Sequence, residues 1–107
     1  MTIGEWLATR APAPPERLTA RIHRALGPSL ASDQSEIVIR CLDAVDELLI
    51  SLRDDPEAGR ERALDLLAAD ALMTYAFEAA AEDPLTLAEI AAGAMWRVGE
   101  VAAELEL

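Results

Sequence analysis

Residues 63–82 decide the fold of this chain: they read ALDLLAADALMTYAFEAAAE and form its most continuously apolar stretch. Two sets of apolar residues in this stretch recur at the three- and four-residue spacing of an α-helix, on roughly opposite faces. The first set is Leu64, Leu67, Ala71 and Tyr75, and the second is Leu66, Met73, Phe77 and Ala80. A helix that is apolar on two faces needs neighbours on both. The sequence therefore predicts that this helix lies at the centre of a helical bundle or dimer.

The composition favours a single all-α domain. The chain has 107 residues, of which 52% are hydrophobic but only 4% aromatic. Its core must therefore be built mainly from Leu, Ile, Val and Ala, and long β-branched runs that would indicate strands are absent. A chain of this length can form one modest core. We expect residues 1–107 to form one small bundle of about five helices, the last three of them long.

Proline and glycine positions predict the ends of the helices. The segment APAPP at residues 11–15 cannot continue a helix, because proline lacks a backbone donor and restricts the residue before it. It divides the region 2–27 into two short helices, the first opened by the capping-box pair Thr2 and Glu5 and the second ended by Gly27. Asp-Pro pairs suit the first turn of a helix and separate the long helices predicted at about residues 33–53, 56–82 and 85–104.

Two long helices carry apolar seams with heptad spacing. The seam in 33–53 is Val38, Leu42, Val45, Leu49 and Leu52. The helix at 85–104 has one seam of Leu87, Ala91, Ala94, Val98, Val101 and Leu105, and a second on its far side of Ala92, Trp96, Gly99 and Ala103. A monomer of this length has too few helices to cover all these faces, so we expect a dimer. The candidate interface or ligand-lining residues are Leu66, Met73, Phe77, Ala92, Trp96, Gly99 and Ala103.

The charge is strongly negative and unevenly distributed. The formal net charge is −11, with +1 in residues 1–40 and −12 in residues 41–107, and the only cationic side chains besides His23 are arginines. Such a field repels nucleic-acid phosphates and anionic lipids, so we expect no nucleic-acid partner. The chain shows no apolar run long enough to span a membrane and no signal segment, and its single cysteine, Cys41, cannot form an internal disulfide. We expect a cytoplasmic protein.

The inventory of reactive side chains argues against an enzyme. His23 and Cys41 are single residues on different predicted helices, and no clustered ligands for a metal ion or Gly-rich phosphate loop accompany them. Cys41 lies on an apolar face, which predicts a buried structural thiol rather than a nucleophile. We therefore predict no catalytic residue, no metal and no cofactor.

Residues 85–92, LTLAEIAA, resemble the first helix of a bacterial helix-turn-helix. The recognition helix would then carry acids, namely Glu100, Glu104 and Glu106. A helix that reads bases presents Arg, Asn or Gln, so a helix-turn-helix regulator is the less favoured alternative.

Residues 68–78, AADALMTYAFE, resemble the helix of the trans-polyprenyl diphosphate synthases (the geranylgeranyl and farnesyl type) that reads AGDALLxxAFE. The matching positions are Asp70, Ala71, Leu72, Ala76, Phe77 and Glu78. AAGA at 91–94 and VG at 98–99 follow in the order of that family's AAGA and VGGQ segments. AVDEL at 44–48, with Asp54 and Asp55, is similar to the helix that ends in its first aspartate-rich motif. The resemblance extends loosely over residues 44–105.

The departures from that family concern its metal sites. Ala58 occupies the place of the third aspartate in the first motif, Glu100 replaces a glycine, and the second aspartate-rich motif and the diphosphate-binding lysines are absent. The resemblance therefore implies a helical core that has lost its magnesium sites, and not a prenyl transferase. It implies a regulatory or subunit-like partner, or a binder of a lipid chain lined by Leu66, Met73 and Phe77.

Two functions follow from the sequence. The first is a non-catalytic helical interaction protein, an adaptor or accessory subunit, whose apolar helix faces bind a second copy or another protein. The alternative is a protein that binds a hydrophobic small molecule, an isoprenoid or acyl chain, between its helices.

Overall fold

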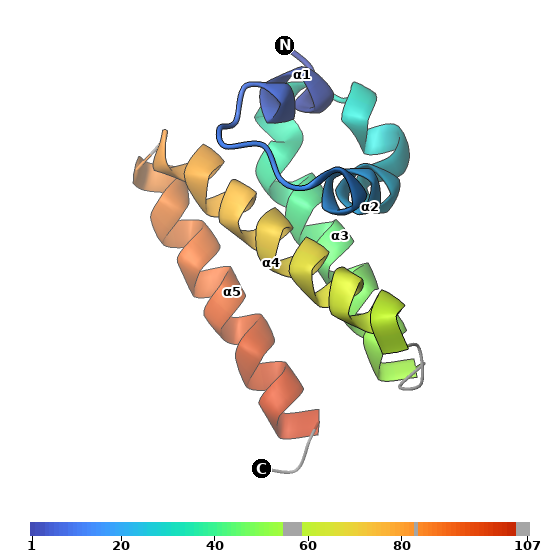
Figure 1. The fold of residues 1–107 in the computed structure, drawn as a ribbon. Coiled ribbons are helices and arrows are strands. Elements are labelled where there is room, and N and C mark those ends of the chain that lie inside the picture. Colours follow the sequence, from blue (N-terminus) through green and yellow to red (C-terminus); the bar gives the residue numbers. More distant parts are fainter. Residues whose placement is uncertain (55–58, 83, 105–107) are drawn as a thin grey trace. The chain divides into compact units, whose positions relative to one another are not determined.

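The computed structural model describes residues 1–54, 59–82 and 84–104. These residues form five α-helices, namely α1 (Ile3–Ala8), α2 (Glu16–Leu26), α3 (Ile37–Asp54), α4 (Gly59–Ala81) and α5 (Pro84–Glu104) (Figure 1). Two 3₁₀ helices, η1 (Gly27–Ala31) and η2 (Gln34–Glu36), connect α2 to α3. Within the described residues, strand-like pairing is limited to one isolated bridge between Thr2 and Asp33. The all-α prediction with five helices is confirmed, whereas the dimer stays a prediction.

The chain divides into two compact units, Met1–Ala76 and Phe77–Leu107. The first contains α1, α2, α3 and most of α4, and the second contains the end of α4 together with α5. The single domain predicted for residues 1–107 stays a prediction.

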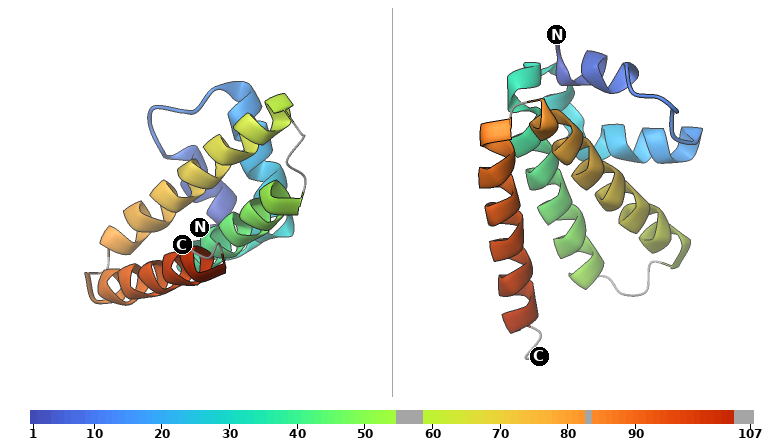
Figure 2. Two further views of the ribbon diagram at one scale, coloured as in Figure 1. Left: turned by 90° about the horizontal axis from the view of Figure 1, so that it is seen from below. Right: turned by 90° about the vertical axis from the view of Figure 1, so that its left-hand side faces the viewer.

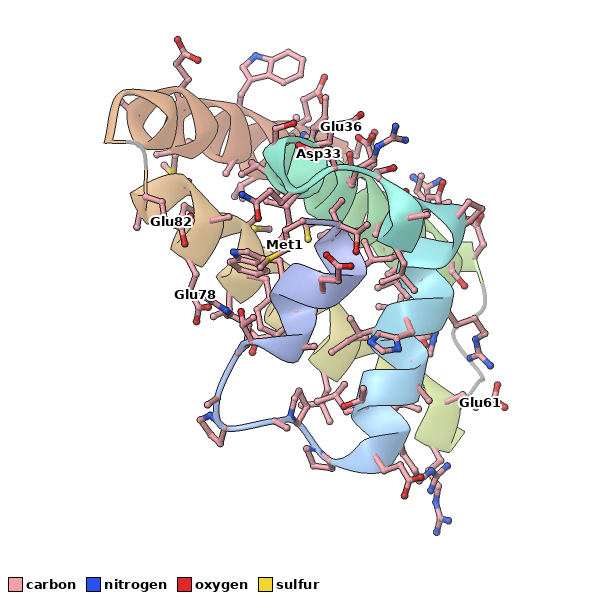
Figure 3. All side chains as sticks on the ribbon, turned by 90° about the horizontal axis from the view of Figure 1, so that it is seen from above. Met1, Asp33, Glu36, Glu61, Glu78 and Glu82 are labelled. Atoms are coloured by element: carbon pink, nitrogen blue, oxygen red, sulfur yellow. The ribbon has the colours of Figure 1, made fainter. Side chains whose placement is uncertain are left out.

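The helix ends follow the sequence signals with one difference. Gly27 ends α2 with a positive φ of 51°, a conformation that glycine adopts without strain, and Pro84 is the first residue of α5. The helix predicted from residue 33 instead starts at Ile37, because Asp33 caps η2 by accepting a hydrogen bond from the N–H of Ser35 (2.9 Å). Figure 3 labels Asp33 and Glu36 on this short segment. The helix starts predicted at Asp55-Pro56 and at Asp83 lie outside the described residues.

The N-terminus of the first unit is fixed by the predicted capping box. The Thr2 hydroxyl accepts from the N–H of Glu5, and the Glu5 carboxylate accepts from the N–H of Thr2, each at 3.1 Å. Backbone hydrogen bonds from Ile3 to the Ser32 carbonyl and from Gln34 to the Met1 carbonyl (2.9 Å each) join this end to the η1–η2 connection. Helix α1 is therefore anchored at its start, with Ile3 and Trp6 in the core.

Within the first unit, α3 and α4 run in opposite directions and α2 lies across them (Figure 2). Helix α3 contacts α2 through a face that differs by one residue from the predicted seam. Its buried residues are Ile37, Cys41, Ala44, Val45, Leu48 and Leu52. The predicted Val45 and Leu52 belong to this face, but Leu49 is exposed. Both registers are apolar, and the observed one presents the smaller Cys41 and Ala44, which allow a neighbouring helix to come closer.

Helix α4 buries a stripe that lies between the two predicted faces and includes Ala80, which was predicted on the second face and is 1% exposed. Ala68, Leu72 and Ala76 have no exposed surface, whereas Leu66 and Leu67 are 51% and 55% exposed. Small alanines at four-residue spacing let the helix backbone approach its neighbours, so the core selects this stripe over the larger leucines. Within the single chain Leu67 is therefore not covered, and its packing in a dimer stays a prediction.

Candidate functional site

The predicted interface residues of the first unit lie at its surface. Leu66 is half exposed and Met73 is partly exposed, and their seven-residue spacing places them on the same side of α4. These apolar side chains can contact another molecule, but they carry no acid, base or nucleophile.

The predicted interface residues of the second unit are also exposed. Phe77 is partly exposed at the end of α4, and Ala92, Trp96, Gly99 and Ala103 are exposed on α5. Steps of four, three and four residues place these last four on one face of α5. Trp96 is 67% exposed, and a Cβ added at Gly99 would meet no atom within 4 Å. This face therefore presents one large indole among small residues.

A pocket of about 220 Å³ lies in the first unit between α1, the proline-rich segment after it, and α2. It is lined by Gly4, Leu7, Ala8, Arg10, Ala13, Pro14, Thr19, Ile22, His23 and Tyr75. Ile22 belongs to the buried core, whereas Ala13 and His23 are exposed at the margin. The pocket thus has an apolar floor that opens to solvent beside polar side chains.

Arg10 is held at this pocket by an aromatic side chain and a hydroxyl. Its guanidinium carbon lies 4.1 Å from the centre of the Trp6 ring, within the range of a cation–π contact. Its Nε and Nη2 donate to the Thr9 hydroxyl (3.3 and 3.0 Å), which itself donates to the Trp6 carbonyl (2.6 Å). Trp6 in turn packs edge-to-face on Tyr75, with ring centres 6.1 Å apart. These contacts give the positive charge a defined position.

Sequence reasoning did not identify this pocket. Trp6 and Arg10 are four residues apart, which is a spacing that brings side chains together near a helix end, and this was the available signal. Tyr75 comes from α4 and Ile22 from α2. Their meeting depends on the packing of three helices, which no local pattern encodes.

Two polar clefts lie on the other side of α2, against α3. One, of about 170 Å³, is lined by residues that include Arg21, Arg24 and Glu47. The other, of about 380 Å³, is lined by Arg24 and Arg40 together with Asp43 and Glu47. Opposite charges are mixed in both clefts, so neither selects a ligand by its charge. Arg21 additionally donates through Nε to the Asp65 carboxylate at 2.5 Å and so joins α2 to α4.

Cys41 is a structural residue. Its side chain has no exposed surface, and burial raises the pKa of its thiol from 9.0 to about 12. The thiolate that acts as a nucleophile is therefore not formed at neutral pH. The predicted buried thiol is confirmed.

The part of the chain that the structure describes contains no group of three His, Cys, Asp or Glu side chains placed to hold a metal ion. Across the same residues, no helix is both long enough and apolar enough to cross a membrane.

Neither the known protein families, nor characterised proteins, nor solved structures give a match to this chain.

Proposed function

We propose that the protein is a non-catalytic interaction protein that pairs with a second copy of itself through one face of α5. This face consists of Ala92, Trp96, Gly99 and Ala103, and is called the Trp96 face below. The single observation that carries the proposal is the exposure of the Trp96 indole on a face otherwise made of small residues. Single exposed apolar side chains are common on protein surfaces, but tryptophan is enriched in protein–protein interfaces.

The spacing of the Trp96 face suits an antiparallel pair of identical helices. Its steps of four, three and four residues read the same in both directions, so a two-fold axis can pass between positions 96 and 99. Trp96 then faces Gly99 of the partner subunit, and Ala92 faces Ala103 of the partner subunit. Each indole would occupy the space left by a glycine, which is the arrangement of a knob in a hole.

The charges beside this face allow such a pair. Glu100 borders the Trp96 face, and an axis between positions 96 and 99 places it level with Met95 of the partner subunit, so the two Glu100 side chains do not oppose each other. This matters because the chain carries a net charge of −11. A parallel pair would bring the two Glu100 side chains to the same level, and like charges at that position oppose association.

The area of the two indoles suggests a reversible dimer. Burying two-thirds of a tryptophan that offers about 200 Å² contributes about 3 kcal/mol per copy. Two copies contribute about 6 kcal/mol, which only begins to offset an association cost of roughly 4–15 kcal/mol. The remaining stabilisation must come from the small residues of the face. We therefore expect a dissociation constant in the micromolar range or higher.

Light-scattering mass after gel filtration, over a concentration series of the full chain, tests the proposal. We expect twice the chain mass of 11.5 kDa at high concentration and a fall towards it on dilution. Trp96→Ala should shift the transition at least tenfold towards higher concentration while leaving helical circular dichroism unchanged. Val98→Ala is the matched control, since it removes an exposed apolar side chain from a different face of the same helix. A monomer at all concentrations, or equal effects of the two variants, contradicts the proposal.

The direction of pairing can be tested separately with a spin label at Ala103→Cys. The buried Cys41 thiol does not compete for the label at neutral pH. In the antiparallel pair the two labelled positions are separated along the axis by roughly 16 Å, from a rise of 1.5 Å per residue, whereas a parallel pair places them level. A single short distance from pulsed electron paramagnetic resonance would show that the antiparallel register is wrong.

The isoprenoid- or acyl-chain binder expected as an alternative has less support. Its proposed lining includes Leu66, which is half exposed and so gives a chain little shelter from water.

A further inference from the structure

We infer that the larger of the two polar clefts between α2 and α3 binds an α-amino acid with an aliphatic side chain, its carboxylate at Arg24 and its ammonium group at Asp43 and Glu47. All the residues that line this cleft belong to the first unit. The site is therefore separate from the Trp96 face and goes beyond the proposed self-association.

Arg24 is the arginine of this region that has no carboxylate partner. Arg21 also lines a cleft on this side of α2, but it donates to the Asp65 carboxylate (2.5 Å). Arg40 lines the larger cleft and donates to the Glu36 carboxylate (3.0 Å). In the described part of the chain, Arg24 forms no ion pair. Its guanidinium carries five N–H donors in a planar fork, which matches the geometry of a ligand carboxylate.

Two carboxylates on α3 lie on the wall opposite Arg24. Asp43 and Glu47 are one turn apart, so their side chains share a face of α3, and both line the cleft. Among the described residues neither of them forms an ion pair, with Arg24 or with another side chain. A ligand with a single charge would be attracted by one wall and repelled by the other. A zwitterion is attracted by both walls, which is how the cleft can select it.

The dimensions of the cleft favour a compact zwitterion. Its volume of about 380 Å³ lies at the lower end of the roughly 300–1,000 Å³ that sites for small organic molecules occupy. Helices α2 and α3 are in contact, and the axes of packed helices are about 8–10 Å apart. The gap between side chains on the facing walls is therefore short. The two charged groups of an α-amino acid are attached to one carbon atom, so they can span such a gap.

The floor of the cleft suits an aliphatic side chain. Leu26 and Ala44 line the cleft and are buried members of the core, and Pro28 lines it as well. An aliphatic group placed against these side chains leaves water and so contributes to binding. The charged rim would then hold the two polar groups of the ligand while the apolar floor holds its body.

Nuclear magnetic resonance titration of the full chain tests the inference. Norleucine is the probe, and hexanoate and hexylammonium are singly charged counterparts of the same chain length. 6-Aminohexanoate is an isomer of norleucine with its two charges at opposite ends of the chain. The signal is the backbone amide resonance of Gly27, which lines the cleft, with that of Gly93 on α5 as the reference. We expect a saturable shift of the Gly27 resonance with norleucine and at least tenfold weaker binding of the other three compounds.

A charge variant of α2 identifies the role of Arg24. Arg24→Gln should weaken norleucine binding at least tenfold and remove the preference for norleucine over hexylammonium, because the carboxylate loses its partner. Arg17→Gln is the matched control, since it removes the same charge from an exposed position on α2 outside both clefts. It should leave binding unchanged.

A charge variant of α3 identifies the role of the two acids. The double variant Asp43→Asn/Glu47→Gln should weaken norleucine binding at least tenfold and remove the preference over hexanoate. Asp70→Asn/Glu82→Gln makes the same two changes at exposed positions outside both clefts and should have no effect. Circular dichroism of each variant establishes that it is folded.

Several outcomes would overturn the inference. One is a Gly27 resonance that norleucine does not shift, and another is equal binding of norleucine and either singly charged compound. Equal effects of a cleft variant and its control would show that the charges of the cleft do not hold the ligand. Binding of 6-aminohexanoate as tight as that of norleucine would show that an α-amino acid is the wrong class.

Discussion

The two units of this chain differ in how far their large apolar side chains are buried. In Met1–Ala76, α1, α2, α3 and α4 each contribute side chains to a buried core that includes Trp6. In Phe77–Leu107, the large apolar side chains of α5 that the structure describes, Met95, Trp96 and Val98, are all exposed. A core of several helices satisfies its own apolar surface, whereas a single helix cannot. The first unit is therefore a packed scaffold, and the second carries the exposed face that we propose as a contact surface.

The two tryptophans show the same difference in burial. Trp6 is buried, stacks under Arg10 and meets Tyr75 edge-to-face, and both of these partners belong to the first unit. Trp96 is exposed in the second unit. The same residue type thus supports a fold in one place and, as we propose, association in the other.

The largest expected effect separates the two units by stability. Leu72→Ala removes a side chain with no exposed surface from α4 and should lower the free energy of unfolding by about 2–5 kcal/mol, because a cavity is left in the core. Val98→Ala, at a position 64% exposed on α5, should change it by less than about 0.5 kcal/mol. Urea denaturation followed by circular dichroism measures both, at a protein concentration where the mass is that of the monomer. Equal losses would mean that the two units do not differ in this way.

The second prediction uses the buried thiol of the first unit as a probe of its core. Folding raises the pKa of Cys41, so its contribution to stability is complete below the ordinary value of 9.0 and is lost as the pH rises towards about 12. The free energy of unfolding should therefore fall by about 1.4 kcal/mol per pH unit in this range, or about 2 kcal/mol by pH 10.5. Cys41→Ala should remove most of this slope. The same slope in the variant would show that other groups cause the alkaline loss.

The sequence predicted the elements of the fold better than their faces. The capping box at Thr2 and Glu5, the stop at Gly27 and the start at Pro84 depend on local backbone chemistry, so a linear pattern contains them. No such local signal marks the buried face of α4. Leucine and alanine occur around the whole helix, so periodicity alone cannot say that Ala68, Leu72 and Ala76 are in the core while Leu66 and Leu67 are outside.

The candidate sites show the same division. The Trp96 face was found from spacing along one helix, and its residues are exposed as an interface requires, but its pairing stays a prediction. The pocket at Arg10 was missed because its lining comes from α1, α2 and α4, which only the folded first unit brings together. The resemblance to the trans-polyprenyl diphosphate synthases also stays a prediction.

The smallest expected effect concerns the anchoring of the first unit at its N-terminus. Thr2→Ala removes the hydroxyl that accepts from the N–H of Glu5, and should cost about 1 kcal/mol, as is typical for the loss of a helix cap. The Glu5 carboxylate remains and keeps its bond to the N–H of residue 2, so the loss should be partial. Trp6 lies in α1, so fraying at the start of this helix should also broaden the Trp6 indole resonance. Thr2→Ser keeps a hydroxyl and is the control, with stability and linewidth close to those of the natural chain. If Thr2→Ala changes neither quantity, the backbone bonds from Ile3 to Ser32 and from Gln34 to Met1 are sufficient to hold α1 in place.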